Sequence, residues 1–146
     1  MFIDQVSSAG AMPALEAMLR FSGQRQRLIA SNIANFETPN YQPADVSPGL
    51  FQRQLQRALD ERREANGGGH GALSVRPTRE VSMSGDGTLR LSPLTPSENV
   101  LFHDRNNRDL ERTMQKLVEN SAMFRVATDL LKSRRGILTS AMQETV

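Results

Sequence analysis

Two histidines are the side chains of this sequence best suited to metal binding or proton transfer. His103 precedes Asp104, and a His-Asp pair can form half of a metal or acid–base site. Neither His103 nor His70 belongs to a histidine cluster or to an H-E-x-x-H spacing. We therefore expect no metal site, and we interpret His103 as a loop residue close to the start of a helix.

Other catalytic motifs are also missing from the sequence. The glycine run at 67–71 lacks the Gly-Lys-Ser/Thr of a phosphate-binding loop, and no Gly-x-Ser-x-Gly elbow occurs. The chain has no cysteine, which excludes disulfides and thiol chemistry. The carboxylates are scattered among arginines, a pattern typical of solvated ion pairs. The residues predict a protein that is not an enzyme and has no cofactor.

Basic residues gather in two stretches, at 53–63 and 125–135. Both stretches also carry acidic residues and lack the interleaved aromatic residues that stack on bases. Lys plus Arg number 18 against 16 for Asp plus Glu, so the overall charge is a weak argument for nucleic acid. A helical nucleic-acid-binding or regulatory module remains the alternative interpretation, and we expect no nucleic-acid partner.

Composition indicates a single, extended domain. The chain has 146 residues, of which 38% are hydrophobic, with one Tyr and no Trp. This is a low content for a compact enzyme, and it favours an elongated or assembly-dependent protein. Residues 1–10 lack the pattern of a cleaved signal peptide, and no apolar run approaches the ~18 residues of a membrane span.

We expect a mainly α fold in which the long N- and C-terminal helices pair as an antiparallel coiled-coil-like hairpin. The prediction for 1–146 is a single elongated domain with four zones. These are a flexible N-terminus at 1–11, an N-terminal helix at 12–35, a short helix with an irregular or β middle segment at 36–106, and a C-terminal helix at 107–142.

The middle segment has two recognisable elements. Residues 50–64 have the spacing of a short amphipathic helix that ends at the glycine run. Apolar and polar residues then alternate around Ser84-Gly85-Asp86-Gly87, which predicts a β-hairpin. In the N-terminal helix, the polar stretch 22–27 interrupts the apolar stripe, and Gly23 weakens the helix by about 1 kcal/mol.

The C-terminal helix carries the strongest periodic signal. Alternating steps of four and three residues define a coiled-coil seam, and Asn107 is a suitable N-cap. Packing between chains is the simplest interpretation, and an ordinary helical hairpin within one chain is the alternative. The predicted assembly helix presents Leu110, Met114, Leu117, Phe124, Leu131, Leu138 and Met142.

The stretch SNIANFETPNY at 31–41 ends the N-terminal helix with many polar side chains. Asn32 and Asn35 lie one turn apart, where their amides can bond free helix-end carbonyls or the backbone of a neighbouring chain. Asn35 can also take the left-handed conformation that ends helices. Pro39 suits the second position of a turn, and Asn40 tolerates positive φ at the third.

These residues resemble the N-terminal signature of the bacterial flagellar basal-body rod and hook family, whose pattern is Asn-Ile-Ala-Asn, two variable residues, then Thr-Pro-Gly-Tyr. Asn40 replaces the family's glycine. Residues 98–102 and the helix after them are similar to the C-terminal segment of the proximal rod branch, type B. The resemblance identifies a family assembly motif made of Asn32, Ile33, Asn35, Thr38, Pro39, Asn40 and Tyr41.

The resemblance implies a mechanical function. Such proteins are exported by the flagellar type III apparatus without a cleaved signal peptide, and they polymerise through their terminal helices in the periplasmic rod of the basal body. The subunit would connect the membrane ring to the rest of the rod and transmit torque. Its partners would be itself, other flagellar rod proteins, and the junction proteins of the membrane ring and export gate.

Overall fold

The computed structural model describes residues 10–67, 69–95 and 109–143. The described chain is mainly helical, as predicted. The expected flexible stretch before residue 10, His103, residues 98–102 and Asn107 lie outside the described residues. The elements, in chain order, are α2 (Met12–Ala34), α3 (Pro48–Asn66), β1 (Val81–Met83), β2 (Leu89–Leu91) and α4 (Leu110–Gln143).

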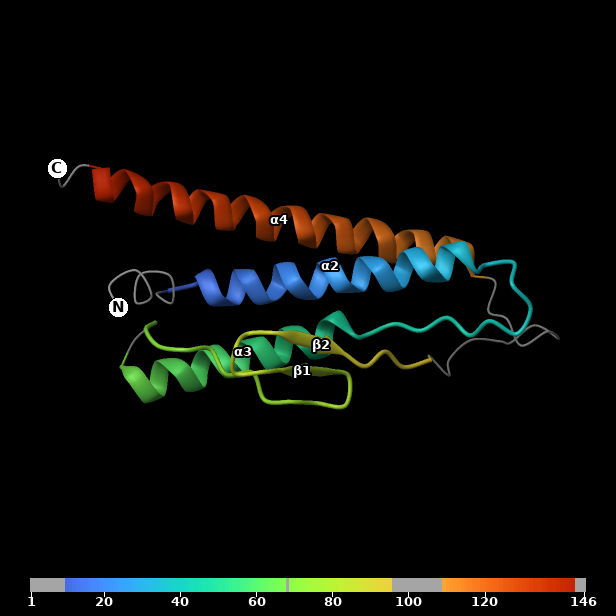
Figure 1. The fold of residues 1–146 in the computed structure, drawn as a ribbon, viewed down its shortest axis with the longest axis horizontal. Coiled ribbons are helices and arrows are strands. Elements are labelled where there is room, and N and C mark those ends of the chain that lie inside the picture. Colours follow the sequence, from blue (N-terminus) through green and yellow to red (C-terminus); the bar gives the residue numbers. More distant parts are fainter. Residues whose placement is uncertain (1–9, 68, 96–108, 144–146) are drawn as a thin grey trace.

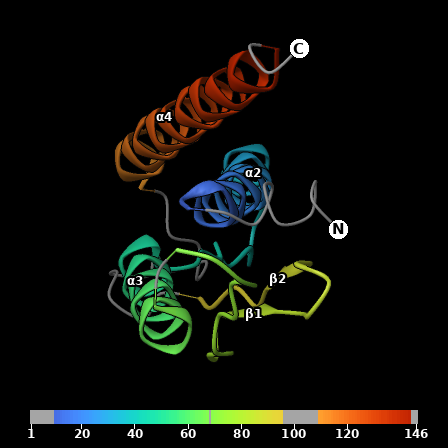
Figure 2. The same ribbon diagram turned by 90° about the vertical axis from the view of Figure 1, so that its left-hand side faces the viewer.

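The elements form three layers, with α2 in the middle. Helix α4 covers one side of α2, while α3 and the β1–β2 hairpin lie next to each other on the opposite side (Figures 1 and 2). The N-terminal end of α2 lies beside the C-terminal half of α4, because Met12 and Leu15 share a buried cluster with Leu131. Helix α2 is therefore the only long element with neighbours on two opposite faces among the described residues.

The short middle helix has clear start and stop signals. Ser47 caps α3 by accepting a hydrogen bond from the Leu50 N–H at 3.3 Å, and Pro48 occupies the first turn. Gly67 ends the helix in the left-handed conformation, with φ of 62°. Near this end, the buried Arg62 donates a hydrogen bond to the Gly10 carbonyl oxygen, which ties α3 to the residue before α2.

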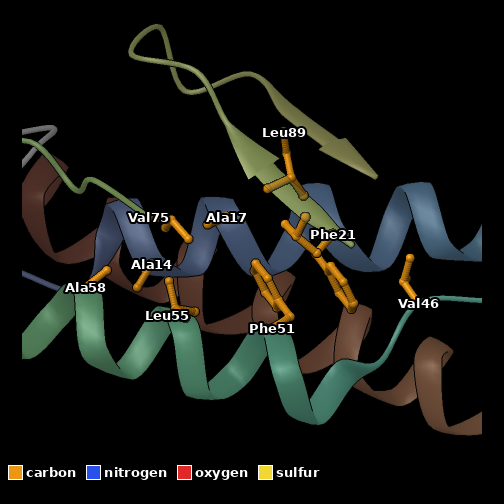
Figure 3. Packing of buried hydrophobic residues seen from close by; sticks show 10 residues of the cluster. Ala14, Ala17, Phe21, Val46, Phe51, Leu55, Ala58, Val75 and Leu89 are labelled. Atoms are coloured by element: carbon orange, nitrogen blue, oxygen red, sulfur yellow. The ribbon is translucent and has the colours of Figure 1, made fainter. Parts of the chain in front are cut away.

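The main hydrophobic core lies between α2 and the middle segment. Phe21 of α2 and Phe51 of α3 stack with their ring centroids 4.1 Å apart, and both are fully buried (Figure 3). The hairpin and the loops supply a third wall to this core. Its buried members are Ala14, Ala17, Phe21, Val46, Phe51, Leu55, Ala58, Val75, Val81 and Leu89.

The predicted hairpin is confirmed. Strands β1 and β2 pair antiparallel, with Val81 opposite Leu91 and Met83 opposite Leu89. Two side chains of α2 hold it in place. Gln24 donates to the Leu89 carbonyl oxygen at 2.7 Å, and Arg20 donates to a carbonyl oxygen in the turn.

Helix α4 has 34 residues, a length of about 51 Å at 1.5 Å per residue. At its N-terminal end, the Asp109 carboxylate accepts a hydrogen bond from the Arg112 N–H at 2.9 Å. Asp109 stands three residues before Arg112 and so satisfies an N–H at the start of the helix. Within α4 the buried residues are Asn120, Ala127 and Leu131.

Candidate assembly site

The elbow after α2 is built around the amide of Asn32. Its Nδ2 donates to the Ala44 carbonyl oxygen at 2.9 Å, and its Oδ1 accepts from the Ala44 N–H at 3.2 Å. The Tyr41 hydroxyl donates to the same Oδ1 at 2.9 Å. The sequence suggested a bond to a helix-end carbonyl or to a neighbouring chain, and in the structure the Asn32 amide instead bonds the Ala44 peptide of its own chain. Asn32 thus fixes where the returning chain lies.

The end of α2 differs from the sequence prediction at Asn35. Its φ of −103° is outside the left-handed region, so the prediction of a left-handed Asn35 is wrong. Instead, the Phe36 N–H donates to the Ile33 carbonyl oxygen at 3.2 Å, and the Thr38 N–H donates to that of Asn35 at 3.0 Å. These tight turns need only negative φ. The Asn35 amide donates to the Ser31 carbonyl oxygen at the helix end at 2.9 Å, as predicted, and the Asn35 N–H donates to the same oxygen at 3.1 Å.

The Thr38–Tyr41 turn matches the prediction. The Tyr41 N–H donates to the Thr38 carbonyl oxygen at 3.3 Å, with Pro39 and Asn40 at the central positions. Asn40 has φ of 60°, the only positive φ among the described residues other than glycine. A central residue with positive φ after proline defines a type II turn, where glycine or asparagine is favoured. Asn40 therefore keeps the turn that glycine makes in the family pattern.

Sequence reasoning missed a charged junction immediately after the elbow. Asp45 accepts two hydrogen bonds from the Arg25 guanidinium, at 2.9 and 2.8 Å, and pairs with Lys116 of α4 at 3.0 Å. Its backbone bonds Leu94 in both directions. Arg25 is only 3% exposed, so the expectation of solvated ion pairs is wrong at this site. The junction links α2, α4 and the chain after the hairpin.

The electrostatics of this junction favour ionised Asp45. Burial raises the pKa of the Asp45 carboxyl, but Arg25 and Lys116 outweigh burial and hold that pKa below its ordinary value. The Val46 N–H adds a hydrogen bond at 2.8 Å. No periodicity marks Asp45, because it lies in an irregular segment and its partners are 20 and 71 positions away. Only the three-dimensional path of the elbow brings them together.

The predicted assembly seam divides into two parts in the structure. Leu131 is buried, while Leu117 and Leu138 are half-buried. The remaining seam positions are exposed, although the Phe124 ring lies next to Gly23 of α2. These positions are Leu110, Met114, Phe124 and Met142, which are 38%, 41%, 42% and 54% exposed.

A second set of exposed apolar side chains runs along α4. Val118, Val126, Leu130 and Ile137 are between 50% and 68% exposed. At 100° per residue, Val126, Leu130 and Ile137 share one flank of the helix, here called the outer face, about 60–140° around the axis from the buried Ala127 and Leu131. Of the nine large apolar side chains that the described residues leave exposed, eight lie on α4. Exposed apolar surface is thus concentrated on one helix.

The described residues carry no sign of a catalytic or membrane-spanning site. No group of three or more His, Cys, Asp or Glu side chains within them is placed to hold a metal ion. Within the same ranges, every helix is too short or too polar to cross a bilayer. What the geometry offers is an ordered elbow and an apolar helix face.

The chain matches several proteins of one kind. The flagellar basal body rod protein FlgB of Salmonella typhimurium is 30% identical over 139 residues, covering 88% of this chain and 95% of that protein. FlgB of Borrelia hermsii is 30% identical over 111 residues, covering 73% of this chain and 76% of its own. The chain belongs to the FlgB family. No protein-family model matches it.

The similarity to FlgB proteins is not confined to the two sequence motifs. FlgB of Yersinia ruckeri is 27% identical over 142 residues, covering 92% of this chain and 95% of that protein. A match of this length includes the middle segment, which supplies α3 and the hairpin to the core. The elbow, the middle segment and α4 are therefore all parts of a FlgB chain.

Proposed function

We propose that this chain is a structural subunit of the proximal rod of the bacterial flagellar basal body, with no catalytic role. One observation carries the proposal: eight of the nine large apolar side chains that the described residues leave exposed lie on α4. Exposed apolar side chains gathered on one element are typical of a protein–protein contact. A rod subunit needs such a surface along its length, because each copy must be held by its neighbours.

The terminal helices supply this surface as a pair. Helices α2 and α4 form an antiparallel coiled-coil-like hairpin within a single elongated domain, 1–146. The hairpin buries Leu131 against Met12 and Leu15 and leaves the rest of the α4 seam for other subunits. Burial of this remaining surface on polymerisation completes the fold, because apolar area removed from water is the main driving force of association.

The motif at the elbow orients the middle segment in this proposal. Asn32 holds the returning chain, and Asn40 sets its turn. The middle segment packs on α2, so the elbow determines how the core is placed relative to the helical pair. Its role in assembly is then indirect: it fixes the shape that each subunit presents.

Partners and location follow from the same proposal. The subunit assembles with itself and with other flagellar rod proteins, and it contacts the junction proteins of the membrane ring and export gate. It reaches the periplasmic rod through the flagellar type III apparatus without a cleaved signal peptide. There it connects the membrane ring to the rest of the rod and transmits torque.

Nucleic-acid binding has no comparable support. The arginines of α3 alternate with acids, and Arg63 lies 3.6 Å from Asp60 while Arg76 lies 3.0 Å from Glu61. Paired guanidinium groups contribute less to binding phosphates than free ones do. Retention on DNA that weakens with salt would favour that alternative.

The test places charge on the outer face of α4. Val126→Asp and Ile137→Asp change side chains that are 55% and 58% exposed, so the free chain is expected to fold as before. Gln56→Asp, which adds the same charge at an exposed polar position of α3, away from α4, is the matched control. The readouts are circular dichroism of the free chain, its amount in the export medium, and its amount in purified basal bodies.

Both apolar-to-charge variants are expected to be exported and folded but absent from basal bodies, with loss of motility. Gln56→Asp is expected to assemble. Normal basal bodies with Val126→Asp and Ile137→Asp would refute the assembly role of this face. Loss of export in all three variants would instead point to a defect before assembly.

A further inference from the structure

A polar layer interrupts the contact between α2 and α4. The Asn120 side chain of α4 is fully buried, and its Nδ2 donates to the Ser22 carbonyl oxygen at 2.9 Å and to Gln26 Oε1 at 2.7 Å. Its own Oδ1 is buried without a hydrogen-bond partner. Ser22 is fully buried as well. Such an incompletely satisfied amide disfavours folding, so a gain in stability does not explain it.

The surroundings of this layer are apolar and periodic. On α2, apolar residues spaced three and four positions apart precede and follow the polar layer. On α4, apolar residues with the same spacing precede and follow Asn120. The α2 positions are Met12, Leu15, Leu19, Ser22, Gln26, Ile29 and Ile33; the α4 positions are Leu117, Asn120, Phe124, Ala127 and Leu131. A repeat of this kind allows two helices to pair in more than one register.

A slip of one heptad would separate Asn120 from its partners. Moving α4 by seven residues in either direction places Asn120 beside Leu15 and Leu19, or beside Ile29 and Ile33. In both positions the amide would lose its partners and remain buried among apolar side chains. Within the direct contact between α2 and α4, the polar layer therefore marks the observed register. The ion pair between Lys116 of α4 and Asp45 would also be broken by a slip.

The Phe124 ring of α4 lies against α2 beside the polar layer. A Cβ built on Gly23 would lie 3.7 Å from this ring, an ordinary van der Waals distance, and Phe124 is one turn along α4 from Asn120. Phe124 is thus an apolar neighbour of the polar layer in the observed register.

We infer that Asn120 is a positioning residue that sets the axial register of α4 on α2. A one-heptad slip displaces α4 by about 10 Å along its axis. Because α2 also carries the core, the slip would shift the apolar faces of α4 by the same distance relative to α3 and the hairpin. The inference concerns the free chain, and it holds or fails independently of the proposed rod assembly.

Distances between two spin labels test this inference directly. The chain has no cysteine, so Ala30→Cys on α2 and Ser133→Cys on α4 give one label on each helix at exposed positions. With Asn120 present, electron paramagnetic resonance is expected to give a single distance. In Asn120→Leu and Asn120→Ala, we expect a second population whose distance differs by about 10 Å, the length of seven helical residues.

Two further variants separate register from general packing. Asn120→Gln retains an amide and is expected to keep the single distance. Thr128→Val removes a hydroxyl that donates to the Phe124 carbonyl oxygen of its own helix, at 2.8 Å, and is expected to change nothing.

A single unchanged distance in both Asn120→Leu and Asn120→Ala would overturn the inference. Loss of the helical circular dichroism signal in both would also overturn it, because Asn120 would then act on stability and not on register. If only one of the two variants folds, its distance distribution decides.

Discussion

The two sides of α2 are packed in different ways. On the side of α3 and the hairpin, the stacked Phe21 and Phe51 belong to a core of ten buried apolar residues. On the side of α4, the buried cluster has three residues, and a polar layer at Asn120 interrupts the contact. The first side is completed within one chain. The second side is specific in register but leaves most of α4 uncovered.

This difference explains how one small chain can be both stable and ready to assemble. The core under α2 supplies apolar burial, the main favourable contribution to folding. Helix α4 adds little burial of its own, and its exposed side chains remain available to other subunits. The core between α2 and the middle segment therefore stabilises a chain whose α4 side chains are still exposed. Mutations can change the core and the exposed face of α4 separately.

The largest effect is expected from the core side. Phe51→Ala removes a fully buried ring stacked on Phe21 and should lower the free energy of unfolding by about 4 kcal/mol. Urea denaturation followed by circular dichroism measures it. Leu50→Ala, at the adjacent position with 41% exposure, is the control and should cost less than about 1 kcal/mol. Equal losses would mean that the stack is not the centre of the core.

The charged junction should come next. Asp45→Asn leaves the buried Arg25 without a carboxylate, and we expect a loss of about 3 kcal/mol at neutral pH. Asp60→Asn, which removes an exposed partner of Arg63 on α3, is the matched control and should change little.

The junction also predicts a pH dependence. The folded pKa of Asp45 is below its ordinary value of about 4, so its contribution is complete above that value. Stability is then lost as the pH falls through the folded pKa, when the carboxyl becomes protonated. The difference in unfolding free energy between the native chain and Asp45→Asn should shrink below about pH 4. A constant difference down to acid pH would contradict the role of this carboxylate.

A smaller effect is expected on the α4 side. Leu131→Ala removes the leucine that α4 buries against Met12 and Leu15, and should cost about 2 kcal/mol, the low end for such changes, because the cluster is small. Leu130→Ala, one position away and 50% exposed, should stay within about 0.5 kcal/mol. If Leu131→Ala cost as much as Phe51→Ala, the two sides of α2 would not differ as described.

The smallest effect is expected at the elbow turn. Asn40→Gly should leave stability within about 0.5 kcal/mol, since glycine accepts positive φ without strain. Asn40→Val should cost about 1–2 kcal/mol, because a β-branched side chain is strained at φ of 60°. Thermal unfolding of the two variants compares them. Equal melting temperatures would argue against a constrained turn.

Local features were predictable from the sequence where local chemistry determines them. The positive φ of Asn40 follows from its place after Pro39, and the hairpin follows from alternation around its turn. The Asn35 amide bonding the helix end follows from the carbonyl oxygens there. In each case the partners lie within a few residues of one another.

Features that depend on distant parts of the chain were not predictable. Phe21 is at the centre of the core because α3 brings Phe51, 30 positions away in the sequence, to stack on it. Asp45 has no pattern of its own, and only the fold joins it to Arg25 and Lys116. The polar stretch 22–27 interrupts the apolar stripe in the sequence, and only the fold shows that Asn120 of α4 bonds to it.

Cysteine accessibility in basal bodies tests the central claim most directly, that the outer face of α4 is the assembly surface. The chain has no cysteine, so Val126→Cys can be labelled with a maleimide alone, both in the free chain and in purified basal bodies. The account predicts rapid labelling of the free chain, where Val126 is 55% exposed, and strong protection in the basal body. Equal labelling in both states would contradict it.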